Sequence, residues 1–457
     1  MRAACIALLL LPLALGHEHH APADIDPKVP IDWMLYTHMA VQTFVWALLF
    51  PIGMVLGLSK SRYHVPVQAV GVAATLAANW LGHKHGGRAF PASVHGVMAK
   101  ILFWVLMVQV ACGVFLRLHV LDTVRPWVRR LHGPLGMAFP ILGWTQILMG
   151  VATALGFCRG GEINQCLAHY IMGSAFIGYA AILVIMLNLG GGWLQSRGWS
   201  QEMLDSCVIL VWGIINTFTE HQGGPWTHKD MQHTMMGVLW WAGGLLGVFL
   251  SRRGKRSFVP AVIIVMTGWG MSAHEQELMI SSKIHAMFGY ALMLAGVLRV
   301  IEICFVLHDA PTPSPAVRVF QHLPPYLLTV SGILFISATN EEMKNADALG
   351  IDHVSYALFD FALSFLVYLV ISFLVHLYAN SGRNRAHSDE AEVGYAKLTQ
   401  REGELDPEGP EAFELAEAGS DEYEASEASH LTGDSDAVKI GGQDEVDWMQ
   451  GTRGLRL

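Results

Sequence analysis

Charged side chains are scarce in this chain of 457 residues: they make up 15% of it, whereas 53% of the residues are hydrophobic. Such a composition excludes an ordinary soluble enzyme and indicates the membrane class of proteins. The sequence also lacks a glycine-rich phosphate-binding loop, a nucleophile elbow and a flavin motif. These absences argue against a built-in nicotinamide site, and no nucleic-acid partner is expected.

Long apolar runs predict an all-α, polytopic transmembrane bundle of about eleven spans embedded in the lipid bilayer. Roughly 20 apolar residues are enough to cross a bilayer as a helix. Basic residues cluster in every second loop, as in SRRGKR at 251–256, so these loops are expected to be cytoplasmic. The expected spans are 33–58, 64–81, 92–117, 132–156, 167–190, 203–221, 231–250, 257–274, 283–305, 323–340 and 353–378.

The two ends of the chain differ from the spans. Residues 1–16, MRAACIALLLLPLALG, are typical of a cleaved signal peptide, and residues 17–32 would form a luminal, histidine-rich segment. Residues 381–457 are expected to be a disordered, acidic, cytoplasmic tail, because residues 388–457 alone hold 19 of the 38 acidic groups. We therefore expect an integral membrane protein of the secretory pathway, in the endoplasmic reticulum, Golgi, vacuole or plasma membrane, with its N-terminus luminal or extracellular.

Cysteine is rare as well, with six in the chain. Two of them, Cys158 and Cys166, share one short loop on the predicted outer side. A disulfide between them suits an oxidising compartment, and two unpaired loop cysteines are the alternative.

Each of the first four expected spans carries a histidine near its start: His38, His64, His95 and His132. Because successive spans reverse direction, His38 and His95 are expected near the outer face, and His64 and His132 near the inner face. Two imidazoles at one depth can fill both axial positions of a haem iron. Ionisable residues inside membranes are costly and usually functional. The sequence therefore predicts two b-type haems stacked across the membrane.

A glycine follows four residues after each of four histidines: His132, His169, His233 and His285. Positions i and i+4 share a helix face, so the glycine could admit a flat macrocycle or a neighbouring helix. For any single motif we expect helix packing, because small residues are common at membrane helix contacts. His169 is expected to cap or pack its helix, with an outer ligand in place of His38 as the alternative.

The stretch THMAVQTFVWALLFPIGMVLGLSKSRYH, followed by VHGVMAK and LHGPLG, resembles the cytochrome b561 fold over roughly residues 33–156. The resemblance implies a four-helix core with two haems b that passes electrons from a cytosolic donor to an acceptor across the membrane. It implies His38 and His95 as ligands of the outer haem, and His64 and His132 as ligands of the inner one. The whole chain resembles the fungal Ytp-type membrane proteins, which join such a region, here 33–190, to a C-terminal membrane region, here 203–380.

In the second half, polar residues gather at the predicted outer ends of several spans. Mixed imidazole and carboxylate ligands suit a divalent metal such as zinc, iron or manganese. A third haem on His233 and His285 is an alternative, while Glu341, Glu342 and His353 are expected to face water. The candidate metal ligands are Glu220, His221, Asp230, His233, His274 and His285.

The expected function is transmembrane electron transfer through two b-type haems. The donor would be a cytosolic reductant, and the luminal or extracellular acceptor a ferric or cupric ion or an oxidised small molecule. The corresponding enzyme class is a transmembrane oxidoreductase of the metal-reductase or monodehydroascorbate-reductase type. Two alternatives stay open: a metal-dependent membrane enzyme or metal transporter that uses the C-terminal spans, and a non-catalytic sorting or signalling protein that uses its acidic tail.

Overall fold

The computed structural model of the protein describes residues 29–219, 221, 225–273, 276–307 and 317–385. The predicted signal peptide, nearly all of the histidine-rich segment, most of the acidic tail, Glu220 and His274 lie outside these residues. Within them the regular elements are helices, apart from one isolated β-bridge between Ile31 and Gly87.

Ten helical segments in the described ranges are long and apolar enough to span a membrane, and α11 is shorter at 14 residues. The predicted all-α polytopic bundle is therefore confirmed, and each of the eleven expected spans corresponds to a helix. The spans are α2 (Trp33–Phe44) with the π turn η2 (Val45–Leu49) and α3 (Phe50–Leu58), α4 (His64–Lys84), α5 (Val94–Leu118), α6 (Arg125–Leu155), α7 (Ile163–Leu189), α9 (Gln201–Thr219), α10 (His228–Leu250), α11 (Val259–Ser272), α12 (Met279–Ile301), α13 (Leu323–Ser337) and α15 (His353–Ala379). The shorter elements are η3 (Gly160–Glu162), α8 (Gly191–Arg197), η4 (Arg252–Gly254), η5 (Glu302–Val306), η6 (Val319–His322) and α14 (Asn340–Ala348).

Several expected spans begin later in the chain than the helices do, as α6 and α12 illustrate. Helix α6 begins at Arg125 rather than at His132, because Pro126 is well suited to the first turn of a helix. Helix α12 begins at Met279, so His285 lies in its second turn and is only 3% exposed. Both histidines are thus helix-interior residues and not residues of a loop border.

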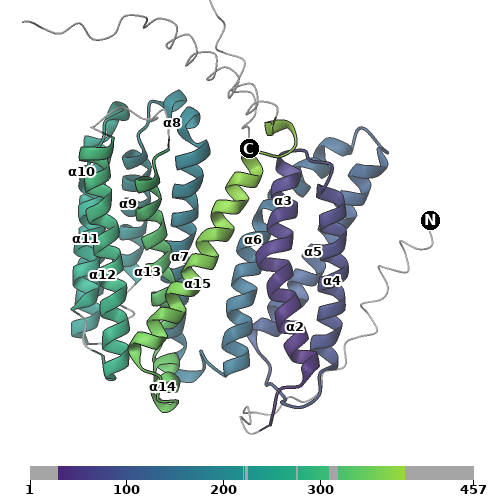
Figure 1. Cartoon of the computed structure of the whole chain (residues 1–457), viewed down its shortest axis with the longest axis horizontal. Helices are drawn as coiled ribbons and strands as arrows, with labels where there is room; N and C mark the ends of the chain where they lie inside the picture. Colours follow the sequence, from purple (N-terminus) through teal and green to yellow (C-terminus); the bar gives the residue numbers. More distant parts are fainter. Residues whose placement is uncertain (1–28, 220, 222–224, 274–275, 308–316, 386–457) are drawn as a thin grey trace, which may run out of the picture. The chain divides into compact units, whose positions relative to one another are not determined.

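The first four spans form two antiparallel hairpins (Figure 1). Helices α2 and α3 pack along α4, and α5 packs along α6; the hairpins meet where α6 touches η2 and α3. Two glycines make room for large rings, Gly71 within the first hairpin and Gly143 where the hairpins meet. A Cβ on Gly71 would lie 2.6 Å from the ring of Phe50, and one on Gly143 would lie 3.0 Å from Trp46.

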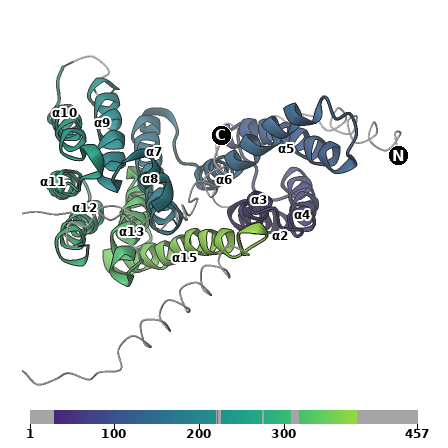
Figure 2. The same cartoon turned by 90° about the horizontal axis from the view of Figure 1, so that it is seen from above.

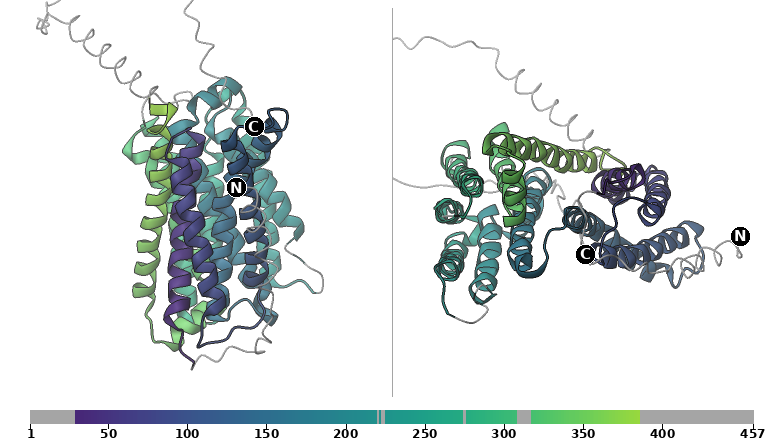
Figure 3. Two further views of the ribbon diagram at one scale, coloured as in Figure 1. Left: turned by 90° about the vertical axis from the view of Figure 1, so that its right-hand side faces the viewer. Right: turned by 90° about the horizontal axis from the view of Figure 1, so that it is seen from below.

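Helices α7 to α13 form a second bundle, built from the close pairs α9 with α10, α11 with α12, and α7 with α13 (Figure 2). Helix α15 packs against α13 and α7 and also against α3, so it connects this bundle to the first (Figure 3). Beyond the end of α15, the backbone N–H of Arg383 donates a 2.9 Å hydrogen bond to the carbonyl of Ser59.

The glycines of the four His-x-x-x-Gly motifs all contact a neighbouring helix. A Cβ on Gly136 would lie 2.9 Å from the side-chain amide of Gln109, and one on Gly173 would lie 2.6 Å from the carbonyl of Gly332. Gly237 lies against α9, and Gly289 lies against α11. The packing interpretation is therefore confirmed for all four motifs.

Two glycines of α11 provide a matched test of this packing. A Cβ on Gly268 would lie 2.5 Å from the carbonyl oxygen of Gly289, whereas a Cβ on Gly270 would meet no atom within 4 Å. Gly268→Ala is expected to lower the free energy of unfolding by about 1–3 kcal/mol, because the backbones of α11 and α12 must separate. Gly270→Ala should not lower it. Thermal unfolding of the purified variants measures the difference, and equal effects would contradict the packing.

Candidate functional site: two histidine pairs

The structure brings the four histidines of the first spans together in two pairs. The ring centres of His38 and His95 lie 6.4 Å apart with their planes at 88°. Those of His64 and His132 lie 6.3 Å apart with their planes at 81°. Each pair joins one hairpin to the other, and the two pairs lie at opposite ends of the spans. The histidines thus pair in the combination that alternating span direction predicts.

The separation of the rings distinguishes two kinds of contact. A direct N–H···N hydrogen bond of about 2.9 Å would place the ring centres about 5 Å apart. With metal–nitrogen bonds of about 2.0 Å, and about 1.1 Å from each nitrogen to its ring centre, two imidazoles on opposite sides of one metal would have centres about 6.2 Å apart. Both observed separations match the second value and are too long for a direct N–H···N hydrogen bond. They also lie within the range of about 4.5–7 Å for edge-to-face ring contacts, as the 6.3 Å between the rings of His322 and Tyr368 illustrates. The dimensions of the pairs thus fit a metal between two opposed imidazoles without requiring one.

Backbone carbonyls orient the rings. Nδ1 of His38 lies 2.8 Å from the carbonyl oxygen of Ala78, and Nδ1 of His64 lies 2.7 Å from that of Gly53. A carbonyl oxygen can only accept, so Nδ1 carries the proton in both rings. In a neutral imidazole the other ring nitrogen, Nε2, is then unprotonated, which is the form that binds a metal.

In the second hairpin, formed by α5 and α6, glutamine side chains contact the histidines in addition to backbone carbonyls. Nδ1 of His95 lies 3.3 Å from the carbonyl and 3.0 Å from the side-chain amide nitrogen of Gln146, and this amide donates to the carbonyl of His95 at 3.1 Å. In the same way, the amide of Gln109 donates to the carbonyl of His132 at 3.0 Å. Nδ1 of His132 is buried and has no hydrogen-bond partner among the described residues.

Each ring also lies against a glycine. A Cβ on Gly57 would lie 2.8 Å from Nδ1 of His64, and a Cβ on Gly150 would lie 3.2 Å from the ring of His95. The absent side chain lets the ring reach the carbonyl one helical turn earlier, at Gly53 for Gly57 and at Gln146 for Gly150. The four pairs are His38 with Gly82, His64 with Gly57, His95 with Gly150, and His132 with Gly113.

These glycines form a repeat that sequence analysis missed. In α4, α5 and α6 the glycine follows the histidine of its own helix by eighteen residues, as His64 and Gly82 illustrate. Eighteen residues make five turns at 3.6 residues per turn, so histidine and glycine share one face about 27 Å apart. His38 and Gly57 are nineteen residues apart, and the π turn η2 between them accommodates the additional residue.

Aromatic side chains fill the layer between the two histidine pairs. The ring of Trp46 lies 4.9 Å from that of Phe50 and 5.5 Å from that of Phe139. The indole N–H of Trp46 donates to the side chains of Gln42, at 3.2 Å, and Thr75, at 3.0 Å. This layer belongs to the buried core of the first four spans.

The predicted metal ligands of the second half do not lie together in one site. His221 lies beyond the end of α9, stacks on Trp226 and has its Nδ1 3.6 Å from a carboxylate oxygen of Asp230. Asp230 forms a capping box with Thr227 at the start of α10, and the carbonyl of His233 accepts from Asn216 at 2.9 Å. Within the described ranges, these candidates do not include three side chains close enough to share one metal ion.

His285 instead meets His169, for which the sequence favoured capping or packing. Their Nε2 atoms lie 3.3 Å apart, and the ring of His169 stacks on Phe335. Nδ1 of His169 lies 2.8 Å from the carbonyl of Gln165, and Nδ1 of His285 lies 2.9 Å from that of Ser281. Each Nδ1–H is therefore held by its own helix, and the two Nε2 atoms face each other.

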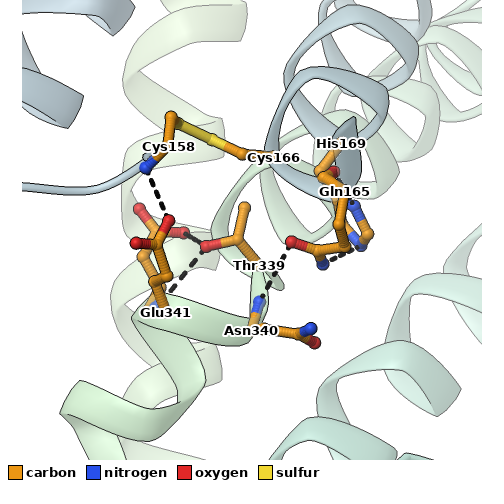
Figure 4. Close-up of a disulfide and its surroundings, with 8 residues drawn as sticks. Cys158, Gln165, Cys166, His169, Thr339, Asn340 and Glu341 are labelled. Atoms are coloured by element: carbon orange, nitrogen blue, oxygen red, sulfur yellow. Dashed lines mark hydrogen bonds between the residues drawn. A yellow bond between two sulfur atoms is a disulfide. The ribbon is translucent and has the colours of Figure 1, made fainter. Parts of the chain in front are cut away.

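Near this pair the structure contains the Cys158–Cys166 disulfide (Figure 4). Glu341, expected to face water, instead accepts a hydrogen bond from the backbone N–H of Cys158. Glu342 was also expected to face water, but burial raises its pKa to about 7 from its ordinary value of 4.5. The expectation was wrong for both residues because α14 folds back against the start of α7.

These features define a polytopic helical membrane protein whose first four spans carry two opposed histidine pairs. The chain belongs to the YTP1-like family, because the family model for the C-terminal part of YTP1-like proteins matches residues 142–379. A domain of unknown function, DUF2427, matches residues 18–119. Three of the four paired histidines lie within that second match, and His132 lies between the two.

The chain is similar to three fungal proteins, two of which are described as membrane proteins. It is 46% identical to Protein YTP1 of Saccharomyces cerevisiae over 242 residues, which are 52% of this chain and 52% of that protein. It is 22% identical to an uncharacterized membrane protein of Schizosaccharomyces pombe over 455 residues, covering 70% of this chain and 89% of that one. It is 24% identical to a second S. cerevisiae membrane protein over 263 residues, covering 45% and 41%. The chain thus spans about half the length of Protein YTP1, and no solved structure matches it.

The raised pKa of Glu342 predicts a pH-dependent stability. The folded state holds this proton more tightly than the unfolded state, so the stabilisation is complete below about pH 4.5 and is lost as the pH rises towards 7. As the pH is raised from about 5 to about 8, the thermal unfolding midpoint of the wild type should therefore decrease relative to the midpoint of Glu342→Gln. Asp347→Asn, which changes an exposed carboxylate on the same helix, should keep the wild-type pH profile. Parallel profiles for wild type and Glu342→Gln would contradict the prediction.

Proposed function

We propose that this protein carries electrons across the membrane through two b-type haems, one held by His38 and His95 and the other by His64 and His132. The observation that carries the proposal is the ring separation of 6.3–6.4 Å at both ends of the spans. This value fits axial imidazoles on opposite sides of one iron and does not fit a direct hydrogen bond. Bound haem would supply one-electron reduction and reoxidation of its iron.

The surrounding residues have separate tasks in this proposal. The carbonyls of Ala78 and Gly53 accept from Nδ1 of His38 and His64, which would leave Nε2 of each neutral ring available to hold a haem iron. The glycines fix each ring on its neighbouring helix. Trp46, Phe50 and Phe139 fill the space between the pairs and exclude water from it.

Basic residues favour an anionic donor at the predicted inner end. Lys60 and Arg62 precede His64, and Arg129 and Arg130 precede His132. Positive charge around a redox site steers an anionic reductant to it. At the other end, the acceptor would be a ferric or cupric ion or an oxidised small molecule, and such a reaction would make the protein a transmembrane oxidoreductase.

Reduced-minus-oxidised spectra of protein produced with ample haem test the proposal. The wild type should bind two haems per chain, and His95→Ala and His132→Ala should each lose one of them, with a different b-type signal missing in each variant. Gly133→Ala is a matched control, because its Cβ would meet no atom within 4 Å. Absence of haem absorbance in the wild type, or the same partial loss in both histidine variants, would overturn the proposal.

A steric variant sharpens this test. Gly57→Val keeps all four histidines but places a side chain where the ring of His64 lies. It should therefore remove the same signal as His132→Ala and leave the other haem in place. Loss of the signal that His95→Ala removes would contradict the assignment of the pairs.

One observation favours a second candidate function, that of a metal-dependent enzyme or metal transporter. Two ligand nitrogens on a tetrahedral ion with bonds of 2.0–2.1 Å lie about 3.3–3.4 Å apart. The Nε2 atoms of His169 and His285 are 3.3 Å apart. Because Nδ1 of each neutral ring donates to a carbonyl, neither Nε2 has a proton to donate to the other. Zinc is the divalent ion that best suits imidazole nitrogens in this geometry.

Cobalt(II) titration of the purified protein tests this metal site, because tetrahedral cobalt absorbs visible light strongly and replaces zinc. His169→Gln and His285→Gln should each weaken cobalt binding more than about tenfold, since each removes one ligand. His221→Gln should bind cobalt as the wild type does, and all three variants should retain the haem spectrum. A cobalt signal that survives His285→Gln, or that His221→Gln removes, would exclude this pair as the site.

A further inference from the structure

A cavity of about 750 Å³ lies within the second bundle, between α7 and α9. Helices α8, α10, α11, α12 and α13 and the turns η5 and η6, with residues that connect these elements, contribute the rest of its lining. Its volume is within the usual range for a small-molecule site, roughly 300–1,000 Å³. Its walls are largely apolar, with large side chains from Phe176, Leu183, Trp212, Trp240, Ile264 and Leu328.

Charged residues lie at one end of this cavity: Arg256, Arg299 and Glu302 line it, and Glu202 forms ion pairs with both arginines without lining it. The guanidinium of Arg299 forms ion pairs with Glu202, at 2.7 Å, and with Glu302, at 2.6 Å. Arg256 forms a further ion pair with Glu202 at 3.0 Å. These residues come from the ends of α9 and α12 and from the loop before α11, which all lie at the predicted inner end of the bundle.

The cluster has more acceptors than the protein satisfies. Asp205 accepts hydrogen bonds from two neutral groups, the hydroxyl of Tyr179 and the amide of Gln201. The second carboxylate oxygen of Glu202 is buried and has no hydrogen-bond partner among the described residues. Three acids face two arginines, and Asp205, which lines the cavity, has neutral partners. The cluster therefore favours a ligand group that donates a hydrogen bond to Asp205 and disfavours a phosphate.

The cavity opens sideways, between helices that span the membrane. Within the described residues, α7 and α9 are not packed along their length. On α7, Ala175, Gly178 and Ile182 line the cavity and are exposed, and Val208 of α9 is also exposed. An opening at this level faces lipid rather than water, so the ligand enters from the bilayer.

We propose that the cavity binds one neutral membrane lipid with a hydroxyl head group, such as a diacylglycerol. Its apolar part lies among the aromatic and aliphatic lining residues, and its hydroxyl donates to the carboxylate of Asp205, which lines the cavity. Burial of apolar surface supplies most of the affinity, and this carboxylate selects the head group. The lipid site uses no residue of the two histidine pairs, so it is independent of the proposed electron transfer.

The test uses the full chain in nanodiscs of phosphatidylcholine that contain a photoactivatable diacylglycerol. Crosslinked peptides are mapped by mass spectrometry. The diacylglycerol probe should label the segments of α7 and α9 that line the cavity, and unlabelled diacylglycerol should displace it. A photoactivatable phosphatidylcholine should label the outer surfaces of the spans without preference for the cavity. Equal labelling of the cavity by both probes, or no labelling there, would overturn the proposal.

Glycine variants separate the cavity from the lipid-facing surface. A Cβ on Gly178, which lines the cavity, would meet no atom within 4 Å, and the same holds for Gly192 at the inner end. Gly178→Phe and Gly192→Phe therefore fill the cavity and should each reduce its labelling by diacylglycerol at least tenfold. Gly270→Phe, at a position equally free of contacts but outside the cavity, should leave labelling unchanged. Wild-type labelling in both filling variants would refute lipid binding here.

Discussion

The first four spans depend on the contact between an imidazole ring and a glycine on the neighbouring antiparallel helix. At one end of each span, a histidine lies against a glycine of the neighbouring helix; at the other end, a glycine contacts that neighbour's histidine. The histidine and the glycine of one span must therefore share a helix face, and a spacing of five helical turns provides this in α4, α5 and α6. In the first span the π turn has the same effect, because it rotates Gly57 back onto the face of His38. The histidine pairs at both ends of the spans therefore follow from one repeated helix-to-helix contact.

Sequence alone predicted which histidines meet, but not what holds them. Each of these histidines lies near the start of its span, and successive spans run in opposite directions. The order of the spans is therefore enough to match the depth of His38 with that of His95, and the depth of His64 with that of His132. The glycine niches could not be found from the i+4 spacing, because Gly136 and its counterparts pack against other helices. The spacing of eighteen residues is visible in the sequence, but its meaning requires knowledge of which helices are neighbours.

The second half shows the limit of depth as a guide. His221, Asp230, His233 and His285 were grouped because all lie near one predicted membrane face. Depth gives the position of a residue along the membrane normal, whereas helix pairing determines its position in the membrane plane. Helix α9 packs with α10, whereas α12 packs with α11 and α13. His285 therefore meets His169 of α7, since α7 and α12 both pack against α13. Glu341 and Glu342 escaped prediction for a related reason, because the fold of the short helix α14 decides their burial.

The two halves handle polar groups inside the membrane differently. In the first four spans, the histidines come together in two opposed pairs, and three of the four rings contact a backbone carbonyl through Nδ1. In the second bundle, a net surplus of carboxylates surrounds one end of an apolar cavity. Burying Glu202, Asp205 and Glu302 in a membrane protein costs free energy that two arginines offset only in part. A ligand that donates hydrogen bonds would offset the remainder, so the ion-pair network and the cavity are best understood as parts of one binding site.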